Sequence, residues 1–130
     1  MRIAEMDNKV ENIQIDVLKS KLHKAMVTDA RLDYVGSITI DENFMDAVGL
    51  MPYEKVLVSN INNGSRWETY TIPGERGSRV ICMNGAAARL AQKGDFVIVM
   101  SFARIPLQAA RGWKPQVLTL EDENRVTHQL

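Results

Sequence analysis

Cysteine, long apolar runs and a secretion signal are scarce or missing in this sequence of 130 residues. Cys82 is the only cysteine, so no disulfide can form within the chain, and a lone cysteine fits a reducing compartment. The longest apolar run, residues 96–100, is far too short to cross a bilayer. Residues 1–9 alternate charged and apolar side chains and lack the apolar core of a secretion signal. We therefore expect a cytoplasmic protein with no membrane partner.

An excess of either charge is also missing. Sixteen Lys and Arg residues balance sixteen Asp and Glu residues, so the formal net charge is zero. Proteins that bind nucleic acid usually carry a basic excess that neutralises phosphates, so we expect no nucleic-acid partner. A neutral chain has little colloidal repulsion, which tolerates self-association. With 45% hydrophobic and 25% charged residues, the composition is that of a single globular domain.

The sequence contains none of the common residue patterns of catalytic and metal sites. His23 and His128 are far apart in the sequence, and no Cys/His cluster has the spacing of zinc ligands. Neither standard pattern of a Gly-rich phosphate loop occurs. The acidic clusters at 41–42 and 121–123 are typical of helix starts and solvated loops. Residue types alone therefore predict only a small β-rich domain.

Alternation and turn signals predict a mainly β fold. Asp41 is expected to cap a short helix at 42–48, and Asn-Gly within 62–65 favours a hairpin turn. An alanine-rich helix is expected at 86–93, whereas 21–27 fits either strand or helix. A small twisted barrel closes many short strands without open edges. The expected strands are 13–17, 37–40, 55–61, 67–72, 79–83, 95–105 and 116–121.

Five short segments add a more specific signal because of their order and spacing. They are KSKLHK (19–24), LDYVGSI (32–38), NGSRWETY (63–70), ERGSR (75–79) and NGAAA (84–88). Together they resemble the aspartate 1-decarboxylase family, pyruvoyl-dependent enzymes that make β-alanine for pantothenate and coenzyme A. The family usually begins only a few residues before the Lys-Leu-His part of the first segment. Residues 1–12 are therefore an extra N-terminal segment, and the sequence leaves open whether it is ordered.

The resemblance implies a proenzyme that cuts itself between Gly36 and Ser37, giving fragments 1–36 and 37–130. Ser37 then becomes a pyruvoyl group, whose ketone condenses with the substrate amine as a Schiff base and accepts the electrons released with CO₂. No metal and no pyridoxal phosphate are expected. The pair suits this chemistry, because a serine hydroxyl can attack the preceding carbonyl, and β-elimination and hydrolysis of the ester leave the ketone. Glycine keeps that carbonyl open, although an isolated Gly-Ser is an ordinary turn pair.

The resemblance also assigns residues that use the ketone. Tyr70 is the proton donor to the carbon that loses CO₂. Thr69 is expected to polarise the Gly36 carbonyl and later to contact substrate. Neighbouring residues of a strand point to opposite faces, so both reach one cavity only with a bend or a second subunit. Arg66 and Lys21 are expected to bind substrate carboxylates, and a solvated surface cation is the alternative for each.

The fifth segment is expected to supply backbone donors. The start of a helix offers unpaired N–H groups that could stabilise the oxyanion of cleavage and later hold a substrate carboxylate. A capped helix packed on the barrel is the alternative. Tyr34 and His23 are assigned to positioning. The residues expected at this helix start are Asn84, for processing, and Gly85, Ala86 and Ala87, for substrate.

By resemblance, the fold is a small six-stranded double-psi β-barrel with short helices. The resemblance further implies a homotetramer with active sites at subunit boundaries and L-aspartate as the substrate. One alternative is a non-catalytic barrel of this type that binds a small ligand or partner without self-processing. Others are a processed decarboxylase for another amino acid and, against the charge balance, a DNA-binding barrel. The need for a maturation factor is left open.

Overall fold

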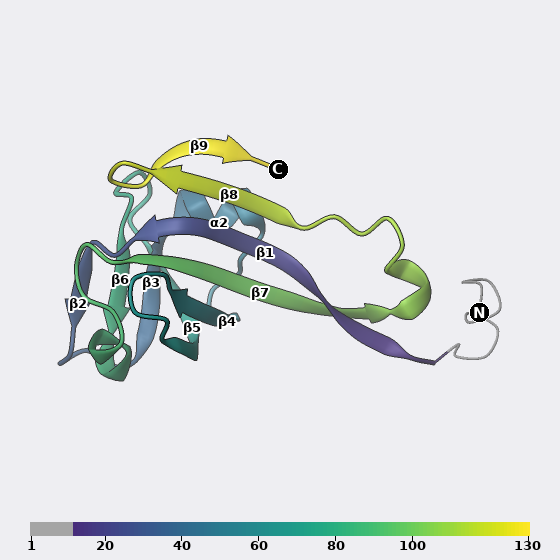
Figure 1. Ribbon diagram of the computed structural model, residues 1–130, viewed down its shortest axis with the longest axis horizontal. Helices are drawn as coiled ribbons and strands as arrows, with labels where there is room; N and C mark the ends of the chain where they lie inside the picture. Colours follow the sequence, from purple (N-terminus) through teal and green to yellow (C-terminus); the bar gives the residue numbers. More distant parts are fainter. Residues whose placement is uncertain (1–11) are drawn as a thin grey trace.

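The computed structural model describes residues 12–130, and the fold is mainly β, as expected (Figure 1). The extra N-terminal segment therefore lies almost entirely outside the described residues. The elements, in chain order, are β1 (Gln14–Met26), β2 (Asp29–Arg31), β3 (Ser37–Asp41), α2 (Glu42–Val48), β4 (Lys55–Asn60), β5 (Arg66–Gly74), β6 (Ile81–Asn84), the 3-10 turn η1 (Gly85–Arg89), β7 (Phe96–Pro106), the 3-10 turn η2 (Leu107–Ala109), β8 (Gln116–Glu121) and β9 (Arg125–Gln129).

The expected number of six strands is wrong, because the sheet has nine. Two of the strands leave little trace in the sequence: β2 has three residues, and β9 is exposed at every position and so shows no alternation. The segments 13–17 and 21–27 belong to one strand, β1. Register shifts at Leu18/Ser20 and Leu22/Ala25 break its alternation of buried and exposed residues, which hides its continuity.

The strands follow the hydrogen-bonded order β2-β6-β3-β5-β4-β7-β1-β8-β9. Three neighbouring pairs in this order are parallel, namely β2 with β6, β3 with β5, and β1 with β8. The helix α2 contacts β3 and β5 and also β1 and β8, so the sheet curls around a shared apolar core. The double-psi closure implied by the resemblance stays a prediction.

Helix α2 forms where the sequence predicts it. The Asp41 carboxylate accepts the backbone N–H of Asn43 at 2.8 Å, which caps the helix. The same buried carboxylate accepts the N–H groups of Gly77 at 3.2 Å and Arg79 at 2.8 Å. Gly49 ends the helix in the left-handed region, at φ 74°. Asp41 thus joins the helix to the loop before β6.

The expected helix at 86–93 is wrong, because only the single 3-10 turn η1 forms. The Leu90 carbonyl, which a longer helix would use, accepts the side-chain amides of Asn60 at 3.0 Å and Asn63 at 3.1 Å. The Gln92 N–H donates to the Asp95 carboxylate at 3.1 Å. These side chains from the β4–β5 turn and the β7 entry replace helical hydrogen bonds and redirect the chain.

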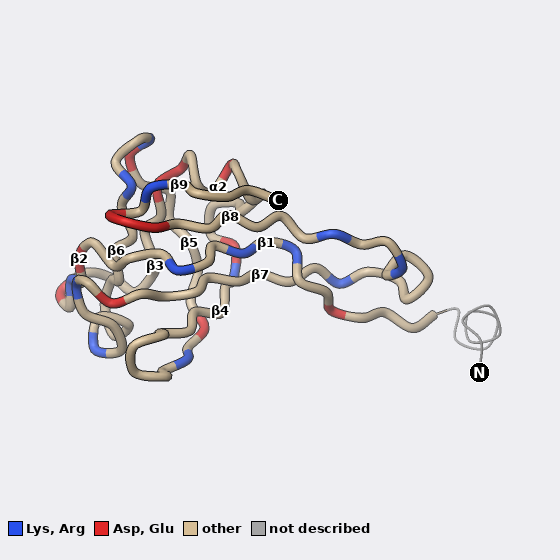
Figure 2. Tube along the Cα trace, turned by 45° about the horizontal axis from the view of Figure 1, so that its top comes forward, with Lys and Arg blue, Asp and Glu red and all other residues tan. Residues whose placement is uncertain are grey.

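The first residues of β1 (14–18) pair with the last residues of β7 (102–106), and together they project as a two-stranded arm (Figure 1). Basic and acidic residues are interspersed along the body and the arm (Figure 2). Between residues 12 and 130, no helix is long and apolar enough to cross a membrane.

Candidate active site

The proposed nucleophile lies opposite an asparagine on the neighbouring strand. Ser37 opens β3, is fully buried, and pairs with Asn84, the last residue of the antiparallel strand β6. The Asn84 side-chain amide Nδ2 donates to Ser37 Oγ and to Thr39 Oγ1, both at 2.9 Å. Residues i and i+2 of a strand share a face, which explains why Ser37 and Thr39 meet one amide. The oxygen of Ser37 is therefore held by a hydrogen bond from the neighbouring strand.

The expected cut site is pressed against Gly85, at the start of η1. A Cβ built on Gly85 would lie 2.8 Å from Gly36 Cα, Gly36 N and the Tyr34 carbonyl oxygen. Gly85 also has a φ of 68°, which side chains other than glycine rarely adopt. By contrast, a Cβ on Gly36 would meet nothing closer than the Asn84 carbonyl oxygen at 4.0 Å. Packing thus demands glycine at 85 but not at 36.

The loop before the cut site is tied down by an arginine that sequence reasoning missed. Arg31 Nη1 donates to Tyr34 Oη, and the guanidinium lies over the Tyr34 ring, 4.9 Å from its centroid. Asp29 accepts from Arg31 Nε at 2.7 Å. This hydrogen bond from Arg31, with the one from the Ala30 N–H, lowers the pKa of Asp29. Tyr34 is more than half exposed, so its ring is held beside the loop at the surface.

Strand β5 changes partner at the expected proton donor. Its residues up to Tyr70 pair with β4, whereas Thr71 onward pairs with β3. Thr71 lies opposite Ile38, the residue after Ser37, so Thr69 and Tyr70 approach the end of β3 where the cut is expected. The Tyr70 ring contacts the Tyr53 ring, with 6.4 Å between centroids. At this change of partner the strand is irregular, and an irregular strand is what Thr69 and Tyr70 need if two neighbouring residues are to face one site.

The expected carboxylate-binding cations lie at positions of the sheet that do not pair with β3. Lys21 pairs with Met100, Met100 with Leu57, and Leu57 with Glu68 on β5. This row puts Lys21 three strand spacings, about 14 Å along the sheet, from β5, and β3 lies one strand further on. Arg66 is exposed at the far end of β5. Within residues 12–130, neither cation forms an ion pair, so both remain available for an anion.

His23 follows Lys21 on the same side of β1. Its Nδ1 is buried and has no hydrogen-bond partner in the described part of the chain. Burial lowers the pKa of His23, and the positive charges of Lys21 and Lys24 lower it further. The ring is therefore neutral near pH 7, which suits a wall of a pocket better than a cation for a carboxylate.

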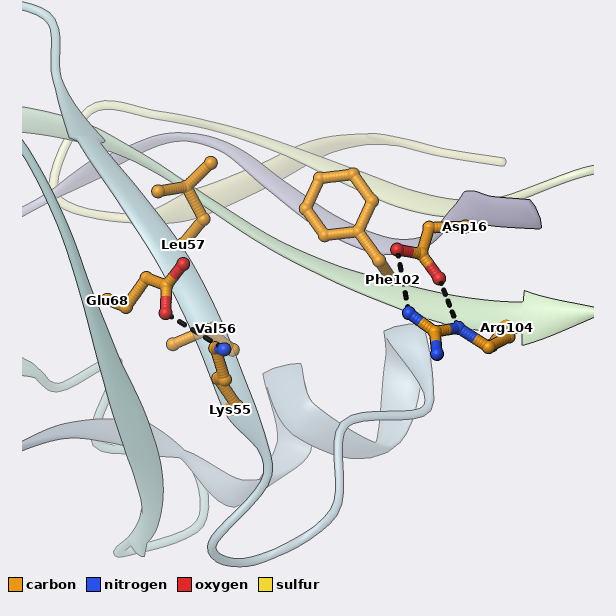
Figure 3. Close-up of a pocket in the computed structure, with 7 residues that line it drawn as sticks. All are labelled: Asp16, Lys55, Val56, Leu57, Glu68, Phe102 and Arg104. Carbon is orange, nitrogen blue, oxygen red and sulfur yellow. Dashed lines mark hydrogen bonds and ion pairs between the residues drawn. The ribbon is translucent and has the colours of Figure 1, made fainter. Parts of the chain in front are cut away.

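Two hollows differ in what they offer a ligand. A groove of about 530 Å³ between the arm and the β4–β5 hairpin contains none of the expected site residues (Figure 3). Its charges already pair with each other, Lys55 with Glu68 at 2.9 Å and Arg104 with Asp16 at 3.0 Å. A second hollow of about 330 Å³ lies beside the cut site, and its lining includes Arg31, Tyr34, Thr39, Cys82 and Asn84. The second hollow is the better candidate because it reaches the Asn84 network.

Thr39 and Cys82 are the members of this network that sequence reasoning missed. They lie directly opposite each other, two pairs further along β3 and β6 than Ser37 and Asn84. The signal that could have found them is the spacing of two, since Ser37 with Thr39 and Cys82 with Asn84 each fall on one face of a strand. No group of three or more His, Cys, Asp or Glu side chains suited to a metal ion occurs among residues 12–130.

Comparison with known proteins identifies the family of the chain. The sequence profile of the aspartate decarboxylase family matches residues 13–127. A protein of Ruminiclostridium cellulolyticum named aspartate 1-decarboxylase is 54% identical over 117 residues, covering 90% of this chain and 91% of the relative. Proteins with the same name from Bacillus subtilis and Lactiplantibacillus plantarum are 55% and 53% identical over 114 and 116 residues, covering 88% and 89% of this chain and 90% and 89% of the relatives. The chain belongs to the aspartate decarboxylase family.

Proposed function

We propose that this chain decarboxylates L-aspartate to β-alanine, after cutting itself between Gly36 and Ser37. The observation that carries the proposal is the contact of Asn84 with Ser37 Oγ, at 2.9 Å, beside a Gly36 backbone that Gly85 approaches without a side chain. The family and the names of the relatives support aspartate as the substrate. β-Alanine would then supply pantothenate and coenzyme A biosynthesis.

The residues around Ser37 fit the formation of a pyruvoyl group. Ser37 is fully buried at the first position of a strand, and Gly85 leaves the adjoining backbone a cradle that a Cβ would fill. When present, a pyruvoyl group supplies a carbonyl that accepts the electron pair released with CO₂. Because both sides of the proposed cut are held by strand pairing, the residues that face Ser37 would stay in place after cleavage.

Cleavage begins when Ser37 Oγ attacks the carbonyl carbon of Gly36. A C–O bond forms, the C–N bond between the two residues breaks, and the hydroxyl proton passes to the departing nitrogen, which gives an ester. Asn84 Nδ2 holds Oγ for the attack, and because the amide donates to this oxygen, the hydroxyl proton stays free to pass to the departing nitrogen. Thr69 is assigned to the Gly36 carbonyl, since β5 approaches the end of β3 at this point.

Substrate binding requires cations that reach the site around Ser37. Lys21 and Arg66 have no ion-pair partner among the described residues, and a guanidinium binds a carboxylate through two parallel hydrogen bonds. We assign both to the substrate carboxylates, with at least one supplied by a neighbouring copy of the chain in a homotetramer. Tyr70 donates the proton to the substrate carbon, and His23 forms a wall of the pocket. Backbone groups of Gly85, Ala86 and Ala87 complete the substrate contacts.

The mass of the purified protein under denaturing conditions tests the proposal. We expect fragments 1–36 and 37–130, with no free amine at the start of the larger fragment, and CO₂ release from aspartate. Ser37→Ala should stay uncut and inactive. A wild-type chain that stays whole after prolonged warming and releases no CO₂ would contradict the proposal and favour a ligand-binding barrel. Light scattering tests the tetramer, and glutamate in place of aspartate tests the substrate. The cytoplasmic location stays a prediction.

A further inference from the structure

The only cysteine of the chain contacts the amide that holds Ser37. Cys82 is buried on β6, and its Sγ lies 3.3 Å from Asn84 Oδ1. Its next acceptor, the Met83 carbonyl oxygen, is further away, at 3.9 Å. None of the steps assigned above uses this thiol. Its place is nevertheless specific, since it faces the oxygen end of the amide whose nitrogen end faces Ser37 Oγ.

The amide of Asn84 has two orientations that occupy almost the same space. In the observed one, Nδ2 donates to Ser37 Oγ and Thr39 Oγ1, and Oδ1 faces sulfur. Turning the side chain by half a rotation would present Oδ1 to both hydroxyl groups and leave the two N–H donors facing sulfur. Neutral sulfur is a weak acceptor, whereas a thiol can donate its proton to an amide oxygen. A protonated Cys82 therefore favours the observed orientation.

The surroundings of Cys82 keep it protonated. Burial raises the pKa of the thiol, and the negative charge of Asp29 raises it further, against a smaller opposite effect of Arg31. The proton needed for donation to Asn84 is thus present at neutral pH.

We propose that Cys82 is a positioning residue for self-cleavage, because its thiol donates to Asn84 Oδ1 and turns the amide nitrogen toward Ser37 Oγ. The inference rests on the proposed function, since it assigns Cys82 to the cleavage reaction. In the turned orientation Oδ1 would accept the hydroxyl proton of Ser37, which must instead pass to the departing nitrogen, and this disfavours cleavage. Cys82 touches neither the scissile carbonyl nor the substrate in this assignment, so it acts only through Asn84.

A role in packing alone is the competing explanation, and two pairs of variants separate the two. Cys82→Ser and Cys82→Ala both place a small side chain at position 82, and only the first carries a hydroxyl group. Cys82→Thr and Cys82→Val both place a larger side chain there, and again only the first carries a hydroxyl group. Any loss of packing is common to both members of a pair, whereas the donor is present in only one. If the variants of one pair fail to fold, the other pair still separates a positioning role from a role in packing.

The experiment measures the fraction of cut chain against time by intact mass, below the lowest melting temperature of the set. We expect the Ser and Thr variants to cut about fivefold faster than their Ala and Val counterparts, the scale of one buried hydrogen bond. Ser101→Ala is the control, because its buried hydroxyl has no partner in the described part of the chain, and its removal should not change the rate.

Equal rates within both pairs, or an Ala variant as fast as wild type, would overturn the role of Cys82 while leaving self-cleavage intact. A Ser101→Ala variant that cuts slowly would also overturn the role of Cys82, because the loss of any buried polar group would then slow the reaction. A wild-type chain that is never cut would overturn the proposed function and this inference together, so the two failures are distinguishable.

Discussion

Gly85 and Gly36 are in closer backbone contact than any side chain at position 85 would allow. A Cβ on Gly85 would lie 2.8 Å from both Cα and N of Gly36. The 3-10 turn η1 and the loop before β3 come from distant parts of the sequence, and this contact sets how η1 meets the proposed cut site. The geometry of cleavage therefore depends on a residue that takes no part in the bond changes.

Gly85→Ala should slow cleavage by at least about tenfold, since a displacement that adds about 1.4 kcal/mol to the barrier has that effect. The reason is the forced separation of Gly36 from η1. Gly64→Ala is the matched control, because Gly64 has a similar φ of 78° but nothing within 4 Å of its Cβ position. Intact mass against time measures the rates. If both variants are slowed equally, the close contact is not the cause.

Asn84→Ala should slow cleavage by about tenfold to a hundredfold, because it removes the donor to Ser37 Oγ and leaves buried hydroxyls without it. Asn60→Ala is the comparison, since Asn60 is also buried and its Nδ2 donates to Leu90 O and Asp95 Oδ2. Both variants should lower the melting temperature, but only Asn84→Ala should lower the rate of the remaining folded protein. Equal rates in the two variants would count against the assignment of Asn84.

Asp41→Ala should destabilise the fold by about 3 kcal/mol, since it leaves buried N–H groups of Asn43, Gly77 and Arg79 without their acceptor. Urea unfolding of the uncut Ser37→Ala chain gives the free energy without interference from cleavage. Asp46→Ala lies at the other end of α2, where an exposed pair with Arg76 is lost, and it should change stability little. A small effect of Asp41→Ala would mean that water replaces the carboxylate.

His23 should make the fold less stable in acid. Its pKa in the folded chain is below the ordinary 6.5, so the unfolded chain takes up a proton first as the pH falls. Stability is lost as the pH falls through the ordinary pKa of histidine toward the pKa of His23 in the folded chain, and the loss is complete below that second pKa. The melting temperature should therefore fall as the pH drops through and below the ordinary value of 6.5, and His23→Gln should reduce that fall.

His128→Gln provides the control for this pH dependence, because His128 is exposed on β9. Its removal should leave the slope of melting temperature against pH nearly unchanged. A slope that is the same in wild type and His23→Gln would show that other groups cause the acid sensitivity.

The sequence predicted the elements whose signals are local. The Asn-Gly turn between β4 and β5 and the cap of α2 at Asp41 involve residues close in the chain, and both formed where expected. The helix expected at 86–93 failed because Asn60 and Asn63, remote in sequence, occupy the Leu90 carbonyl. Strand β9 carries no buried face, so periodicity had nothing to detect.

In the candidate site, too, the residues with local signals were predicted and the contacts between remote strands were not. The resemblance pointed to Ser37 and Asn84, but their pairing across β3 and β6 follows from strand order, which no periodicity contains. Cys82 lies in an apolar stretch of the sequence, and no local pattern indicates the contact of its sulfur with the Asn84 amide. Lys21 and Arg66 lie at sheet positions that do not pair with β3, and these positions follow from strand order rather than from local patterns.

The position of β1 has a consequence for the life of the mature protein. The fragment before the proposed cut contributes β1, which lies between β7 and β8, and β2, which pairs with β6. An uncut chain folds at a rate independent of its concentration. Once cut, the same sheet can form again only when two separate molecules meet, so its recovery slows on dilution. A cut enzyme unfolded by heat would thus regain its fold at a rate that depends on its concentration, whereas an uncut chain would not.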